Sequence, residues 1–347
     1  MINFKLIKKL KFIWKVRLLP DFLFFIFIFI GCNSKGLIEF SGFTMGTTYN
    51  IKIAESGNIG NLNTHQVKID SVLHHVNNLF STYIENSEIS RFNNSMNDFQ
   101  ISNEFKYLFL LSKSIYESTN YTFDPTIHSL VKLWGFGNKG RIDSLPSSNI
   151  IINMLNEIGL DKIELTQNIL SKNSPYIELD FSAIAKGFGV DEISKYLVSQ
   201  KISNFMIEIG GEVFCYGNKF EKEWKIGLQN PFNENIIKII SLNNLAMATS
   251  GNYRNFFELE GVKYSHTIDP QSGYPVKHDI VSVSVIAKNC ATADAYATAL
   301  MVLGVEKGLE IVNRDKELEA VFIEGQDGNY KLIKSINIDE IMVDLLD

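Results

Sequence analysis

An aspartate and a threonine four positions apart, Asp294 and Thr298, lie in an alanine-rich stretch of the sequence. On a helix, residues at this spacing project from the same face. A carboxylate and a hydroxyl are hard oxygen ligands, which suit Mg²⁺ better than zinc or copper. The same spacing is also common on a solvated helix face or at a local cap. The surrounding alanines favour the metal site, because they let the helix pack closely and a buried aspartate needs a partner.

A second candidate site is the segment LDFSAIAKG at 179–187, where Asp180 ends an apolar run and Lys186 follows a turn. A lysine in the first turn of a helix is typical of a phosphate site, because the helix N-terminus also attracts anions. The alternative is an ordinary Asp–Lys pair on the surface.

The third candidate is His266, which precedes the turn sequence TIDPQSG at 267–273. A histidine held by a rigid loop can act as a general base, although a single histidine more often has a structural role. The sequence contains no G-x-S-x-G, H-E-x-x-H or C-x-x-C motif, so it offers no pattern for a serine hydrolase, a zinc protease or a dithiol oxidoreductase.

The segment GFGNKG at 135–140 matches G-x-G-x-x-G. The dinucleotide-binding motif needs a strand before it, a helix after it and an acidic residue about 20 positions later. Here LVKLW precedes the glycines and a polar, proline-containing segment follows. We therefore interpret 135–140 as a glycine loop.

The hydrophobic pattern predicts the elements that position these candidates. Two short strands within 38–54 flank a polar break at 45–48, and helical spacing predicts helices at 67–80, 105–116, 147–159, 185–198 and 291–303. Further strands are predicted at 176–179, 205–209, 213–216, 224–228, 280–287, 318–323 and 330–333. Helices and strands mix without a strict βαβ rhythm, which predicts one α+β catalytic domain.

The composition excludes several classes of protein. The chain has 347 residues, of which 45% are hydrophobic and 21% charged, with a net charge of −6. This argues against a disordered chain and against a nucleic-acid-binding protein. Three cysteines are too few for a disulfide scaffold. Cys215 and Cys290 either pair in an oxidising compartment or are small buried residues, and the sequence assigns them no role.

The N-terminus has the composition of a secretory signal. Six Lys and Arg residues precede the nine-residue apolar run Phe22–Ile30, and Gly31 and Cys32 follow it. Nine residues are too few for a membrane-spanning helix, which needs about 20. Gly31–Cys32 resembles a bacterial lipobox, which implies cleavage before Cys32 and lipidation of its thiol, with an uncleaved anchor as the alternative. In both cases we expect the body of the protein outside the cytoplasm.

The predicted division is therefore a signal peptide at 1–31, a lipidated tether at 32–37 and a catalytic domain at 38–347. The first 31 residues hold six basic residues and one acidic residue, so their removal leaves 27 basic and 38 acidic residues, a net charge of −11. We expect local cations to carry the binding of any anionic ligand to such a chain.

Taken together, nine segments resemble the FAD:protein FMN transferase (ApbE-type) family, which is typically a periplasmic lipoprotein of bacteria. They span about residues 40–304 and occur in the order FSGFTMGTTYNIKI, FSTYIENSEISRFN, FDPTIHSLVKLWGFG, ELDFSAIAKGFGVD, IEIGGEV, WKIGLQNP, ATSGNYRNFF, YSHTIDPQSGYP and ATADAYATALMVLG. The resemblance implies a mixed α/β catalytic domain of the ApbE type, not a Rossmann fold.

The resemblance also implies roles for individual residues. The flavin contacts would be Met45, Tyr83, Thr122, Phe123, Asp124, Asp180, Lys186 and Ile268. The Mg²⁺ ligands would be the backbone carbonyl of Ala183 and the side chains of Asp294 and Thr298. His266 matches the histidine of the family's S-H-x-x-D-P motif, and we expect it to be the catalytic base.

The reaction implied is phosphoryl transfer from FAD. A threonine or serine hydroxyl of an acceptor protein attacks the phosphorus on the FMN side, AMP leaves, and FMN stays attached through a phosphoester. The acceptors would be membrane subunits of redox complexes or secreted flavin reductases. Two alternatives are a periplasmic Mg²⁺-dependent FAD pyrophosphatase, in which water attacks, and a non-catalytic lipid-anchored flavin-binding protein.

Overall fold

The computed structural model describes residues 36–345 except 56, 97, 137–139, 141, 234, 253–255, 260 and 327. The chain divides into the units 1–34 and 35–347, and the second contains all the described residues. The predicted signal peptide and Cys32 lie outside them. No described helix is both long enough and apolar enough to cross a membrane.

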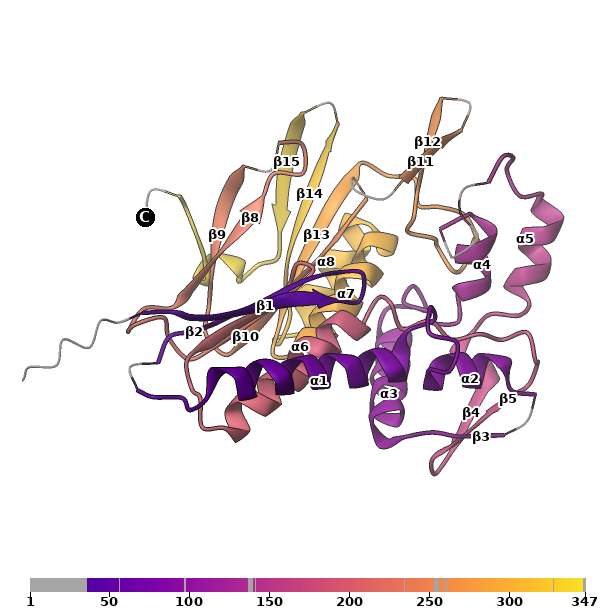
Figure 1. The fold of residues 1–347 in the computed structure, drawn as a ribbon. Helices are drawn as coiled ribbons and strands as arrows, with labels where there is room; N and C mark the ends of the chain where they lie inside the picture. Colours follow the sequence, from indigo (N-terminus) through magenta and orange to yellow (C-terminus); the bar gives the residue numbers. More distant parts are fainter. Residues whose placement is uncertain are drawn as a thin grey trace, which may run out of the picture. The chain divides into compact units, whose positions relative to one another are not determined.

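An eight-stranded sheet forms the centre of the described unit, in the order β1-β2-β6-β7-β10-β13-β14-β15 (Figure 1). Its strands are β1 (Ile38–Thr44), β2 (Thr47–Ile53), β6 (Phe205–Ile209), β7 (Glu212–Tyr216), β10 (Leu245–Gly251), β13 (Ile280–Ala287), β14 (Glu319–Gln326) and β15 (Asn329–Lys334). Each neighbouring pair is antiparallel, and Tyr49 of β2 lies opposite Ile209 of β6. The mixed α+β prediction is thus confirmed, and a doubly wound parallel sheet is excluded.

The two faces of the sheet carry different cores, because side chains alternate along each strand. In β10, Ala246 and Ala248 belong to the larger core, whereas Met247 belongs to a second one. Helices α6 (Ala185–Ser199) and α7 (Cys290–Leu303) pack on the first face, and α1 (Leu62–Phe80) and α8 (Val305–Arg314) pack against them. The second core includes residues of a small sheet of β16 (Met342–Val343), β9 (Ile236–Leu242) and β8 (Trp224–Gln229).

The remaining elements build the region around 80–180, a hairpin, and one short helical turn at 338–340. They are α2 (Glu88–Asn94), α3 (Asn103–Ser118), α4 (His128–Leu133), α5 (Ser148–Leu155), η1 (Leu160–Lys162), η2 (Ile338–Glu340), β3 (Phe99–Gln100), β4 (Ile163–Thr166), β5 (Ile169–Lys172), β11 (Phe256–Leu259) and β12 (Val262–Ser265). A third hydrophobic core joins α4, α5 and β11. There the Trp134 indole donates to the carbonyl of Gly273 at 2.8 Å, which fixes the turn that follows His266.

The predicted strand at 176–179 is wrong. Only Glu178 makes an isolated parallel bridge, to Ile127. The backbone of Leu179 pairs with a side chain instead of with a neighbouring strand. The Asn93 side chain donates to the Leu179 carbonyl at 2.8 Å and accepts the Leu179 N–H at 2.7 Å. The helix predicted to end at Gly159 ends earlier, at Leu155. Gly135 and Phe136 follow helix α4 rather than a strand, as the non-Rossmann interpretation of this segment requires.

Candidate active site

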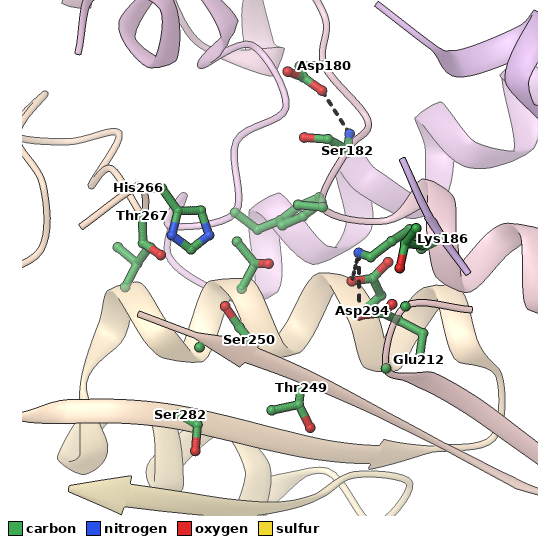
Figure 2. Close-up of a pocket in the computed structure, with 18 of the residues that line it drawn as sticks. Asp180, Ser182, Lys186, Glu212, Thr249, Ser250, His266, Thr267, Ser282 and Asp294 are labelled. Atoms are coloured by element: carbon green, nitrogen blue, oxygen red, sulfur yellow. Dashed lines mark hydrogen bonds and ion pairs between the residues drawn. The ribbon is translucent and has the colours of Figure 1, made fainter. Parts of the chain in front are cut away.

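One cavity of about 890 Å³ gathers nearly all the candidate residues (Figure 2). This volume is in the range of small-molecule sites. The candidates that line it are Tyr83, Thr122, Phe123, Asp124, Asp180, Ala183, Lys186, His266, Ile268, Asp294 and Thr298. Segments that are more than 200 residues apart in the sequence therefore meet at one place.

Lys186 of α6 lies between two carboxylates at one side of this cavity. Its Nζ is 3.5 Å from Oδ1 of Asp294 and 3.4 Å from Oε1 of Glu212 (Figure 2). Asp294 is only 5% exposed, and its Oδ2 accepts the Gly187 N–H at 3.0 Å. The solvated-face interpretation of Asp294 is thus wrong, and Lys186 pairs with these two acids rather than with Asp180.

Charge and burial oppose each other in this cluster. Burial alone lowers the pKa of Lys186, but the charges of Asp294 and Glu212 outweigh it, so the pKa is raised and the ammonium stays protonated. Burial raises the pKa of Glu212 to about 8, although Lys186 opposes the shift. Oε2 of Glu212 is buried and has no hydrogen-bond partner among the described residues. The cluster therefore contains an unsatisfied buried polar atom, which favours a polar or charged partner in the cavity.

These residues suit a hard divalent cation. The described residues contain no group of three His, Cys, Asp or Glu side chains that would hold a metal by themselves. The expected set instead combines the Asp294 carboxylate, the Thr298 hydroxyl and the Ala183 carbonyl, all of which line the cavity. Such an oxygen-only set, next to the unsatisfied Glu212 oxygen, fits Mg²⁺, which usually keeps waters and takes substrate phosphate oxygens as further ligands.

Helices α6 and α7 touch at Gly187, directly beside this cluster. A Cβ at position 187 would lie 2.3 Å from the carbonyl oxygen of Cys290 and 2.7 Å from Cα of Ala291. One turn later, the Asp191 carboxylate accepts the N–H groups of Cys290 at 2.8 Å and of Ala291 at 3.0 Å. Burial raises the pKa of Asp191 to about 6, although these two hydrogen bonds oppose the shift.

Asp180 is held as a carboxylate by a histidine that the sequence did not reveal. Its Oδ2 lies 2.8 Å from Nδ1 of His128, and its Oδ1 accepts the Ser182 N–H at 2.8 Å. Burial by itself raises the pKa of Asp180, but the bonds from His128 and Ser182 outweigh it and lower the pKa. Asp180 is thus held in place and ionised at the wall of the cavity.

The loop before α4 forms a rigid wall. Thr122 donates to the carbonyl of Thr119 at 2.8 Å, and Phe123 is buried. Oδ1 of Asp124 accepts the backbone N–H of Thr126 at 2.8 Å and its hydroxyl at 2.6 Å. Burial raises the pKa of Asp124 to about 6, against the effect of these bonds. In contrast, Tyr83 is 75% exposed at the rim.

His266 follows β12 and lies on another side of the cavity from Lys186 (Figure 2). Its ring meets that of Phe136 edge-on, with the centroids 6.3 Å apart. The next residue, Thr267, donates to the side chain of Asn252 at 2.9 Å, and Ile268 is buried in the third core. This arrangement places a histidine on a well-anchored loop at the cavity.

Met45 is the one candidate among the described residues that the structure does not bring to the cavity. It occupies the β1–β2 turn with φ of 50°, and its Cε lies beside Gly189 of α6. Its neighbours Thr47 and Thr48 do line the cavity. Cys215 and Cys290 are buried and are not disulfide-bonded.

The sequence reasoning missed several polar residues that line the cavity. They are His128, Glu208, Glu212, Thr249, Ser250 and Ser282. A signal existed for Glu212, because it directly follows Gly210 and Gly211, whose φ values of 63° and 107° turn β6 into β7. The others come from strands and a short helix whose positions depend on long-range packing.

The chain matches known proteins over most of its length. Residues 45–322 match the model of the ApbE family. An FAD:protein FMN transferase of Vibrio cholerae is 39% identical over 304 residues, which cover 86% of this chain and 91% of the relative. One of Escherichia coli K12 is 33% identical over 319 residues, covering 87% and 90%. The solved structure of the flavin transferase ApbE from Vibrio cholerae superposes with a TM-score of 0.81 at 37% identity, covering 88% of this chain and 99% of that one.

Proposed function

The chain belongs to the ApbE family and is an FAD:protein FMN transferase, and from this premise we propose how its cavity binds FAD and directs FMN to a threonine or serine hydroxyl of an acceptor protein. The observation that carries this proposal is the single cavity that joins the Lys186–Asp294–Glu212 cluster, the Asp180–His128 pair and His266. It offers a lysine and a candidate cation position for the phosphates, a fixed acceptor for the flavin, and a base.

The reaction replaces one phosphoester partner by another. The acceptor hydroxyl oxygen forms a bond to the phosphorus on the FMN side of the FAD pyrophosphate, the bond from that phosphorus to the bridging oxygen breaks, and AMP leaves. Such transfers depend mainly on alignment and on neutralising phosphate charge. We assign Lys186 to a phosphate oxygen, because its raised pKa keeps the ammonium charged inside a negative cavity.

The cation would be held by Ala183, Asp294 and Thr298. When bound there, Mg²⁺ supplies Lewis-acid stabilisation of phosphate charge. Asp294 is the only carboxylate of the three ligands, and the Gly187 N–H fixes one of its oxygens. Lys186 lies between Asp294 and Glu212 and offsets the charge of Asp294 before substrate arrives.

The flavin would bind at the side of the cavity formed by α4 and the loop before it. Asp180, kept ionised by His128, can accept an N–H of the isoalloxazine ring. Phe123 and Ile268 supply buried apolar surface, and Tyr83 is placed at the rim to cover the ring.

We assign the acceptor proton to His266. Its place on the cavity wall opposite the Lys186 cluster suits a base that meets the incoming hydroxyl rather than the phosphates (Figure 2). A well-placed general base contributes about 10²–10⁴-fold to the rate.

We further propose that the working protein is an extracytoplasmic lipoprotein, anchored through Cys32 on the periplasmic side of a bacterial membrane. The basic region, the short apolar run and Gly31–Cys32 support this placement. The acceptors would then be membrane subunits of redox complexes or secreted flavin reductases that expose a threonine.

The test is a transfer reaction with the full chain purified in detergent. FAD, Mg²⁺ and a candidate acceptor are mixed, and we expect flavin fluorescence on the acceptor in a denaturing gel, a mass gain equal to FMN, and release of one AMP per FMN attached. If FMN and AMP are released but no acceptor in a panel is labelled, the activity is that of an FAD pyrophosphatase and not of a transferase.

A further inference from the structure

Asp191 joins the two helices that carry the proposed cation ligands. It lies on α6, two turns after the Ala183 carbonyl, and its carboxylate accepts the N–H groups of Cys290 and Ala291, the first two residues of α7. The first N–H groups of a helix have no partner within the helix, and their partial positive charge favours an anionic acceptor. Asp191 is thus a cap for α7 that is supplied by another helix.

The two halves of the cation site come from these two helices. Ala183 lies two residues before the start of α6 and Lys186 lies in its first turn, whereas Asp294 and Thr298 lie on α7. Any slide or rotation of α7 along α6 changes the separation of the three ligands. Mg²⁺ demands near-ideal octahedral geometry at about 2.0–2.1 Å, so it tolerates such changes poorly.

A second contact fixes how closely the helices approach, but it does not fix their offset. Gly187 sits against the Cys290 carbonyl and Cα of Ala291 without a side chain, and its N–H donates to Asp294. Backbone against backbone leaves a smooth surface along which helices can slide. The hydrogen bond from Gly187 to Asp294 restrains this sliding at one point, and the two directional bonds of Asp191 add a second restraint at the first turn of α7.

We propose that Asp191 is a positioning residue for the cation: by holding the first turn of α7, it sets Asp294 and Thr298 at the distance from Ala183 that Mg²⁺ requires. This inference rests on the proposed function, since it assumes the cation site on those three residues. Asp191 is not among the described residues that line the cavity, so its effect passes through α7.

A matched control exists elsewhere in the chain. The Glu88 carboxylate accepts the backbone N–H and the hydroxyl of Ser102, which is the N-cap of α3. Glu88 is therefore also an acid that caps a helix from outside, but neither it nor Ser102 lines the cavity. Removing the charge of Glu88 therefore measures the general effect on stability of weakening a helix N-terminus.

The experiment measures cation binding directly in the full chain purified in detergent. Mn²⁺ serves as the probe, its free concentration is followed by electron paramagnetic resonance, and Mg²⁺ is used as competitor. For Asp191→Asn we expect at least a tenfold weaker Kd for both ions, in line with other residues that orient metal ligands, and a larger loss for Mg²⁺ than for the more tolerant Mn²⁺. For Glu88→Gln we expect the wild-type Kd values, whatever its melting temperature.

Equal Kd values for Asp191→Asn and the wild type would overturn the role of Asp191. So would an equal loss in Asp191→Asn and Glu88→Gln, because the effect would then follow stability alone. If Asp191→Asn does not fold, Asp191→Glu keeps the charge and both acceptor oxygens, and its extra methylene group should displace α7 and weaken Mn²⁺ binding. A wild-type chain that binds no divalent cation would instead overturn the metal site of the proposed function itself.

Discussion

Replacing Gly187 by alanine should reduce transfer far more than it reduces stability. The added Cβ would lie 2.3 Å from the carbonyl oxygen of Cys290, whereas ordinary contacts begin at 3.4 Å. Because its nearest neighbours are backbone atoms of α7, no side-chain rotation relieves the clash, and the helices must separate by about 1 Å. The hydrogen bond from the Gly187 N–H to Asp294, now 3.0 Å long, would then be lost.

The magnitudes differ for stability and for rate. Overpacking costs about 1–3 kcal/mol, while alanine regains up to about 1 kcal/mol of helix propensity over glycine. A net loss of about 0–2 kcal/mol remains when the full gain is realised, which corresponds to at most a few degrees in melting temperature. Displacement of a positioned group by 1 Å can cost about 10²-fold in rate, so we expect roughly that loss in kcat.

A matched variant lies two residues away in the same helix. A Cβ at Gly189 would meet Cε of Met45 at 2.9 Å, which is the far end of a flexible side chain that can move. Gly189→Ala should therefore keep its melting temperature within about 2 °C and its kcat within about threefold of the wild type.

The assay follows FMN attachment by in-gel flavin fluorescence at saturating FAD and Mg²⁺, with melting temperatures measured by calorimetry. A Gly187→Ala enzyme that transfers FMN at the wild-type rate would show that the α6–α7 contact does not set the geometry of the site. Equal losses at 187 and 189 would refute the distinction between backbone and side-chain contacts.

Three other substitutions test separate parts of the site and core. His266→Ala should retain FAD binding in a fluorescence titration yet lose about 10²–10⁴-fold in transfer, and an unchanged rate would remove His266 as the base. Phe181→Ala should lower the free energy of unfolding by about 3–5 kcal/mol in urea, because this ring is fully buried against Phe80 and Phe105; a loss below 1 kcal/mol would contradict tight packing there. The pKa of Asp124 is about 6 in the folded chain, against 3.8 in the unfolded chain. Between these two pH values the folded state keeps a proton that the unfolded state releases. The contribution of this carboxyl to stability is therefore complete below pH 4 and is lost as pH rises through 6. Asp124→Asn should therefore flatten the fall in melting temperature between pH 4 and 6, and a slope identical to that of the wild type would contradict the buried, neutral carboxyl.

Much of the fold follows from local patterns. The alternation of apolar residues located β6 at its observed bounds, Phe205–Ile209, and the helical spacing located α6 and α7 to within one residue at each end. β10 (Leu245–Gly251) was missed because alanine, threonine and glycine give a weak strand signal. Its small side chains instead suit a central strand on which α7 packs closely.

Less of the site than of the fold could be predicted from the sequence. Spacing suggested Asp294 with Thr298, since both lie on one helix, but it gave no sign that Lys186 would contact Asp294 across 108 positions. The Asp180–His128 pair and the place of Glu212 also depend on how α4, α6 and the sheet meet. Such contacts arise from tertiary packing, for which a single sequence carries no local signal.

The pairing of β2 with β6 has a consequence for how the chain reaches its native state. Tyr49 pairs with Ile209, which lies 160 residues later in the chain, and closing so long a loop is slow. A chain that is synthesised from its N-terminus presents the β1–β2 hairpin long before β6 emerges. During that interval the backbone groups of β2 that later pair with β6 are an open sheet edge, which can join another chain. We expect the hairpin to be the segment at which aggregation of the incomplete chain begins, and the segment that a chaperone must cover.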